Sequence, residues 1–115
     1  DYVDDFGRYI EYYHSGKVYG EGPRMGNRNS GHWRFFAEDG TIQMEGEYVA
    51  GKRQGEWMHY FSSGKLHSKG FYENDIPVGF WEYFYETGEV HKKGTYQAGK
   101  RSGEWLSLSP TGSIL

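Results

Sequence analysis

Tryptophan and glycine recur at a fixed spacing along this chain. Trp33, Trp57, Trp81 and Trp105 are each 24 residues apart, and a glycine stands two positions before each of them. Between the tryptophans, apolar and polar side chains alternate in short runs that end at glycine-containing turns, which is typical of β-strands. A fixed period of this size is the signature of a repeat architecture.

Each repeat is predicted to be a β-hairpin. The first strand runs from the Gly-x-Trp to the next aromatic pair, for example from Gly55 to Phe61, and a turn such as Asp39-Gly40 or Ser63-Gly64 follows. The return strand carries an aliphatic residue, a glycine and a tyrosine, and a second turn leads to the next repeat. The repeats leave no room for a crossover helix, so all strand pairing is expected to be antiparallel. The expected fold is therefore all-β, a single-layer antiparallel meander of tandem β-hairpins.

The whole chain, residues 1–115, is expected to form one repeat domain. A degenerate first repeat at 7–30 has Tyr9 in place of the tryptophan and follows an acidic lead-in. Full repeats are predicted at 31–54, 55–78 and 79–102, and a half repeat at 103–115. Each hairpin adds roughly 10 Å, which gives a ribbon about 45 Å long.

The spacing also predicts the register and the two faces of the ribbon. If Asp39-Gly40 is a two-residue loop, Trp33 lies opposite Gly46, and Gly46 can also meet Trp57 through the second turn. A single layer is expected to leave these rings partly exposed. One face should carry Trp33, Trp57, Trp81, Trp105, Tyr48, Tyr72, Tyr96, Ile42, Leu66 and Val90. The other face should be polar, except for a stripe of Tyr12, Phe36, Tyr60, Phe84 and Leu108.

Composition narrows the possible functions. Only 36% of the residues are hydrophobic but 19% are aromatic, and 18 glycines argue against helices. The net charge of −3 disfavours a nucleic-acid partner. We expect a soluble chain, since no apolar run reaches membrane-span length. A start at Asp1 suggests a processed form or a piece of a longer protein. The compartment stays open.

No catalytic or metal site is expected. His67 and His91 occupy equivalent positions in successive repeats, about 10 Å apart, which is too far for a shared metal ion. Glu56 and Glu104 are two repeats apart, too far for acid–base partnership. No nucleophile motif or phosphate-binding loop is present. We therefore expect neither enzymatic activity nor a cofactor.

The repeated Gly-Glu-Trp-x-x-Tyr-x-x-x-Gly-x-Leu and Glu-Gly-x-Tyr-x-x-Gly-Lys-Arg-x-Gly-Glu-Trp patterns resemble MORN repeats (membrane occupation and recognition nexus) from Gly7 to Ile114. They are most similar to the bacterial variant found in YwqK-family antitoxins. The resemblance implies a hairpin ribbon used for protein–protein contact, dimerisation or membrane-adjacent scaffolding.

Three surfaces are candidates for binding. The first is the aromatic face, formed by the four tryptophans with Tyr48, Tyr72 and Tyr96, which could also be only the core of the ribbon. The second is the stripe of Phe36, Tyr60 and Phe84. The third is a basic edge of Lys52, Arg53, Lys100 and Arg101, which could hold an acidic partner or serve only for solubility.

The expected function is a non-catalytic protein–protein interaction or scaffolding module. Its partner is another protein, or a second copy that pairs through the open sheet edges. The alternatives are a ligand-binding module for glycans or anionic lipid headgroups, with weak membrane contact, and an antitoxin-type neutraliser of a partner protein.

Overall fold

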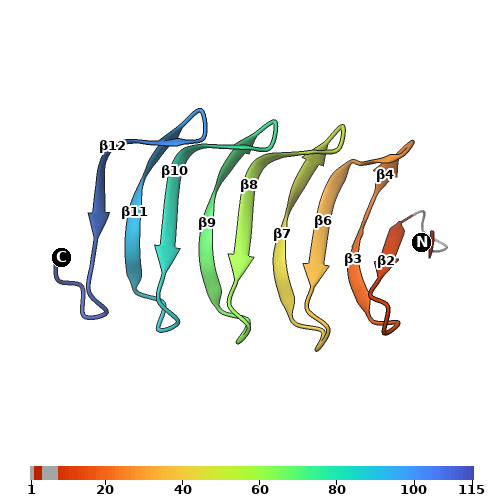
Figure 1. The fold of residues 1–115 in the computed structure, drawn as a ribbon, viewed down its shortest axis with the longest axis horizontal. Helices are drawn as coiled ribbons and strands as arrows, with labels where there is room; N and C mark the ends of the chain where they lie inside the picture. The colour runs from red at the N-terminus through yellow and green to blue at the C-terminus, as the bar shows by residue number, and fades with distance from the viewer. Residues whose placement is uncertain (1, 4–7) are drawn as a thin grey trace.

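The computed structural model describes residues 2–3 and 8–115, so the acidic lead-in and the start of the first repeat at Gly7 lie largely outside the described residues. Its ten-stranded antiparallel sheet follows the order β1-β2-β3-β6-β7-β8-β9-β10-β11-β12, and β4 and β5 form a separate small hairpin (Figure 1). This all-β meander confirms the predicted fold class. The strands are β1 (Tyr2–Val3), β2 (Tyr9–Tyr12), β3 (Val18–Gly22), β4 (Arg24–Met25), β5 (Arg28–Asn29), β6 (Gly31–Phe36), β7 (Ile42–Val49), β8 (Lys52–Tyr60), β9 (Leu66–Glu73), β10 (Ile76–Phe84), β11 (Val90–Gln97) and β12 (Lys100–Ser107).

The turns between repeats are two-residue loops. Ala50-Gly51 joins β7 to β8, and both residues have positive φ angles, of 52° and 84°. Positive φ at both central residues is the type I′ geometry, which matches the twist of a hairpin. Asn74-Asp75 and Ala98-Gly99 repeat this geometry in the next two hairpins. These turns stack on one another, because the Asp75 amide donates to the Arg53 carbonyl and the Gly99 amide donates to the Pro77 carbonyl.

The turns within repeats differ from the expected two-residue loop. The Ala37 amide donates to the Thr41 carbonyl at 2.8 Å, so the loop has three residues and ends at Gly40, whose φ is +91°. The prediction of Asp39-Gly40 as a two-residue loop was wrong. The predicted register is nevertheless confirmed, with Trp33 opposite Gly46 and Gly46 opposite Trp57. A β-bulge restores it, since Phe35 pairs with Met44 whereas Phe36 pairs with Ile42.

This bulge moves the aliphatic residues to the other face. Phe36 lies on the face opposite Trp33, and its cross-strand partner Ile42 must share its face. Leu66 pairs with Tyr60, and Val90 pairs with Phe84, in the same way. The placement of Ile42, Leu66 and Val90 beside the tryptophans was therefore wrong. We call the face that carries the tryptophans the Trp face and the opposite one the outer face.

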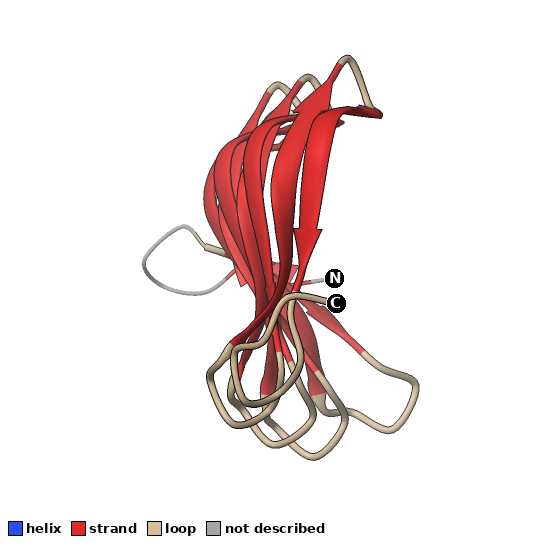
Figure 2. Ribbon diagram, turned by 90° about the vertical axis from the view of Figure 1, so that its left-hand side faces the viewer, coloured by secondary structure: helices blue, strands red, loops and turns tan. Residues whose placement is uncertain are grey.

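A second irregularity bends each long strand near its start. In β8, Gln54 pairs with Glu47 but Trp57 pairs with Gly46, so Gly55 and Glu56 are extra residues relative to β7. Gly55 has a φ of +78°, which glycine adopts without steric penalty. The sheet is accordingly curved along the strand direction (Figure 2). Near the hairpin tip, the Arg53 guanidinium carbon lies over the Trp face, 4.1 Å from the centroid of the Tyr72 ring.

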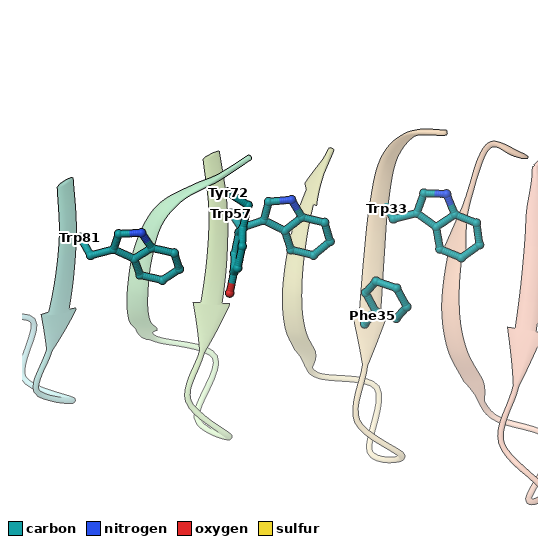
Figure 3. Packing of buried hydrophobic residues seen from close by; sticks show 5 residues of the cluster. All are labelled: Trp33, Phe35, Trp57, Tyr72 and Trp81. Carbon is teal, nitrogen blue, oxygen red and sulfur yellow. The ribbon is translucent and has the colours of Figure 1, made fainter. Parts of the chain in front are cut away.

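The Trp face holds the core. Trp33 and Trp57 are 0% exposed and Trp81 is 3% exposed, with Phe35 and Tyr72 also buried (Figure 3). The expectation that a single layer leaves these rings partly exposed was wrong for the three inner tryptophans. Curvature and close stacking of successive repeats replace the second layer that a flat sheet would need. The longest dimension of the molecule is 50 Å, close to the expected length of the ribbon.

Candidate functional site

Each tryptophan reaches back onto the preceding return strand. The Trp57 indole lies over Gly46, where a Cβ atom would be 2.3 Å from the ring, and its Nε1–H donates to the Glu47 carbonyl at 2.9 Å. That carbonyl lies beside the bulge in the β7–β8 pairing. The same bond recurs at the other three tryptophans, from Trp33 to Pro23, from Trp81 to Phe71 and from Trp105 to Thr95. The tryptophans therefore connect successive repeats.

The tyrosines of the aromatic face complete this core. Tyr48 packs edge-on against Trp57 with ring centroids 5.1 Å apart, and Tyr72 packs edge-on against Trp81 at 5.2 Å. Tyr96 repeats the contact with Trp105. Such edge-to-face pairs contribute about 0.5–1.5 kcal/mol each beyond burial. Because the inner tryptophans and Tyr72 are buried, the predicted aromatic-face residues that a ligand can still reach are the partly exposed Trp105, Tyr48 and Tyr96.

The outer face carries a wider apolar stripe than the sequence indicates. The bulge of each repeat adds an aliphatic partner to each aromatic residue of the predicted stripe. The outer stripe consists of five cross-strand pairs in a row, Tyr12/Val18, Phe36/Ile42, Tyr60/Leu66, Phe84/Val90 and Leu108/Ile114. Near its N-terminal end, Val18 and Phe36 line a hollow of about 300 Å³. The aliphatic half of this stripe was missed, because only the three-residue loop reveals the face on which it lies.

Charged residues run beside the outer stripe and are largely paired. Arg34 contacts Glu21 at 2.8 Å, and Glu45 accepts hydrogen bonds from the Tyr60 hydroxyl at 2.6 Å and from His32 at 2.9 Å. Partial burial would raise the pKa of the Glu45 carboxyl, but these hydrogen bonds outweigh it and lower the pKa. Burial and the bond to Glu45 raise the pKa of Tyr60 to about 12. The charges therefore frame the stripe without a strong net field.

The predicted basic edge is not a set of four free charges. Arg53 donates from Nε to the Asp75 carboxylate at 3.0 Å and stacks on Tyr72, while the Arg101 guanidinium lies 4.4 Å from the Trp105 ring centroid. Lys52 and Lys100 are exposed at the hairpin tips. Two lysines some distance apart offer a weaker attraction to an anionic surface than a cluster of four cations would.

The histidines lie among aromatic rings. His67 packs against Phe61 at 4.8 Å between ring centroids, and His91 stacks on Tyr85 at 4.3 Å. Burial and, to a smaller extent, the positive charge of the nearby Arg53 lower the pKa of His59. Among residues 2–3 and 8–115, no three His, Asp or Glu side chains cluster as a metal-binding group. The described part of the chain also contains no helix that could cross a membrane.

Comparison with known families gives one match. The model of the MORN repeat variant matches residues 7–24, 30–50, 53–74 and 78–98, which together make up more than half of the chain. A search of curated proteins gives no match. The matched segments contain the glycines of the repeated indole-over-glycine contact and three of its four tryptophans, Trp33, Trp57 and Trp81.

Proposed function

Since the chain belongs to the MORN repeat variant family, whose repeats are commonly protein- or membrane-interaction modules, we propose that it is a non-catalytic module that binds another protein. The observation that carries this proposal is the outer stripe. It runs along the sheet from the β2–β3 hairpin to the last turn at Leu108 and Ile114, and it lies on the face that the aromatic core does not use.

The outer stripe suits a protein segment better than a small ligand. It combines aromatic and aliphatic side chains along the sheet and is bordered by polar groups, as at the centre of many protein interfaces. The core of the ribbon is formed on the Trp face. The stripe is therefore available for binding without loss of the contacts that hold the repeats together.

The alternatives are supported by fewer features. Glycan binding through stacked rings would rely mainly on Trp105, since the other three indoles are buried. Anionic headgroups would meet chiefly Lys52 and Lys100 at the tips. A neutralised protein, as the resemblance to YwqK-family antitoxins implies, is one specific form of the proposed partner. Co-expression with that partner would then reverse its growth inhibition.

A pull-down with matched variants tests the proposal. Immobilised protein is exposed to an extract of the source cells, and retained proteins are compared between wild type, Phe84→Ser and Thr95→Ser. Thr95 is an exposed outer-face residue outside the stripe, so its variant serves as the control. We expect one protein to be retained by wild type and Thr95→Ser and lost from Phe84→Ser at an unchanged melting temperature.

Light scattering and ligand assays distinguish the partners. If the molar mass of wild type and Thr95→Ser rises with concentration but that of Phe84→Ser does not, the partner is a second copy of the chain. The proposal is contradicted if the pull-down retains no protein and all three proteins bind anionic liposomes or oligosaccharides equally well.

A further inference from the structure

Four outer-face residues on β9 and β10 are apolar where the other full repeats are polar. We call Phe71, Ile76, Val78 and Phe80 the β9–β10 patch. The equivalent residues one repeat earlier and one repeat later are Glu47 and Thr95 for Phe71, Lys52 and Lys100 for Ile76, Gln54 and Ser102 for Val78, and Glu56 and Glu104 for Phe80. The same sheet therefore has polar side chains at these positions twice, one repeat earlier and one repeat later.

The patch is exposed and contiguous. Phe71 is 42% exposed, Ile76 is 46% exposed and Phe80 is 48% exposed. Phe71 pairs directly with Val78 across the β9–β10 hairpin, and Ile76 pairs two residues nearer the tip. These side chains project away from the aromatic core, so packing within the sheet does not account for them. A cluster of exposed apolar residues of this kind marks an interaction site.

A hollow adjoins the patch at the hairpin tips. Ile76 and Val78 line one side of a space of about 430 Å³, and Tyr96 and Ala98 of the following hairpin line another. Ile76 also packs close to Gly99 of the following tip, where a Cβ atom would lie 3.2 Å from Ile76 Cγ2. A partner side chain can therefore be enclosed between two successive tips, which is how anchoring residues bind.

The part of the rim nearest Phe71 and Phe80 is acidic, whereas Lys52 and Lys100 lie one repeat away from Ile76 on either side. Glu56 lies opposite Phe71, and Glu73 lies opposite Ile76. Glu104 is exposed on β12, at the position equivalent to Phe80 one repeat later. None of these three carboxylates forms an ion pair with another described residue. On the side toward the outer stripe, Glu82 lies between the cationic residues Lys69 and Lys93, so that side has no excess of negative charge.

We propose that the β9–β10 patch binds a basic amphipathic segment of another protein, with apolar side chains on the patch and Lys or Arg against Glu56, Glu73 and Glu104. Complementary charge around an apolar centre favours a basic partner over an acidic one. This surface is separate from the outer stripe, so the inference goes beyond the proposed function and its test does not depend on that stripe.

A peptide titration tests this inference. The probe is a fluorescein-labelled peptide of alternating leucine and lysine, and its binding is followed by anisotropy. A serine–lysine peptide of equal charge measures attraction without apolar contact, and a leucine–glutamate peptide reverses the charge. The test variant is Phe71→Thr/Phe80→Glu, which introduces residues found at the same positions of other repeats. Val49→Thr is the control, because Val49 is 58% exposed and lies on β7, outside the patch.

We expect the leucine–lysine peptide to bind wild type and Val49→Thr equally and to bind the test variant at least about tenfold more weakly. Glu56→Gln/Glu104→Gln should weaken the same binding and reduce its dependence on salt. Equal affinity for the test variant and wild type, or equal affinity for all three peptides, overturns the inference. Melting temperatures of all variants show that the fold is retained.

Discussion

The indole-over-glycine contact makes a sharp prediction for Gly70→Ala. A Cβ atom at Gly70 would lie 1.9 Å from Cδ2 of Trp81, whose side chain is 3% exposed. The ring would have to move by at least about 1.5 Å to regain ordinary contact. Gly70 has no positive φ, so alanine meets no backbone penalty and the whole effect comes from the ring.

The size of the effect follows from what Trp81 loses. Overpacking of a well-packed core costs about 1–3 kcal/mol. Displacement also weakens the hydrogen bonds from its Nε1–H to the Phe71 and Val78 carbonyls, which costs about 1 kcal/mol more. We therefore expect Gly70→Ala to lower the free energy of unfolding by about 3 kcal/mol. Urea denaturation followed by circular dichroism measures this value, provided that the m-value stays constant.

Two comparisons isolate the cause. Gly94→Ala creates a similar clash with Trp105, 2.3 Å from Cδ2, but that ring is partly exposed at the sheet edge and can move. We expect a loss of about 1 kcal/mol there. In a Trp81→Leu background, Gly70→Ala should be nearly neutral, giving a coupling energy of about 3 kcal/mol. A loss below about 0.5 kcal/mol for Gly70→Ala, or equal losses at Gly70 and Gly94, would refute the reasoning.

Three further predictions concern the turn, the paired charges and the edge tryptophan. Ala98 has a φ of 51°, so Ala98→Asn should raise the unfolding free energy by about 0.5–1 kcal/mol in the same urea assay, because asparagine tolerates this conformation. The raised pKa of Tyr60 means that its contribution is complete below pH 10 and is lost by about pH 12, and the lowered pKa of Glu45 means that its contribution is lost as pH falls below 4.5. The urea midpoint of wild type should therefore fall both at high pH and at low pH. In Tyr60→Phe both decreases should be smaller than in wild type. Acrylamide should quench the fluorescence of Trp105 most, and Trp105→Phe should remove most of the accessible emission, whereas unchanged quenching would contradict the burial order.

The 24-residue period was sufficient to predict the hairpins, their antiparallel order and the position of each tryptophan opposite a glycine. These features depend on residue spacing alone. The face of Ile42 could not be predicted in the same way, because a two-residue loop and a three-residue loop with a compensating bulge give the same register at Trp33. Only the backbone hydrogen bonds of Ala37 distinguish the two.

Burial of the tryptophans depended on curvature, which the sequence pattern does not state. The bend at Gly55 needs a positive φ and two extra residues on one strand, and both are properties of the folded backbone. The binding surfaces were only partly predictable for the same reason. Phe36, Tyr60 and Phe84 were recognised as a stripe by alternation, whereas their aliphatic partners became visible once the bulge was located.

The architecture separates the residues that build the fold from those available for binding. Glycine and tryptophan recur in each repeat because each indole must lie on a residue without a side chain and donate to the carbonyl that follows it. Outer-face positions near the tips carry no such requirement, so polar and apolar residues are both compatible with the same sheet. A departure from the period at those positions therefore says little about stability and more about contacts with another molecule. By that reasoning, Phe71 and Phe80 are informative because their counterparts in other repeats are polar.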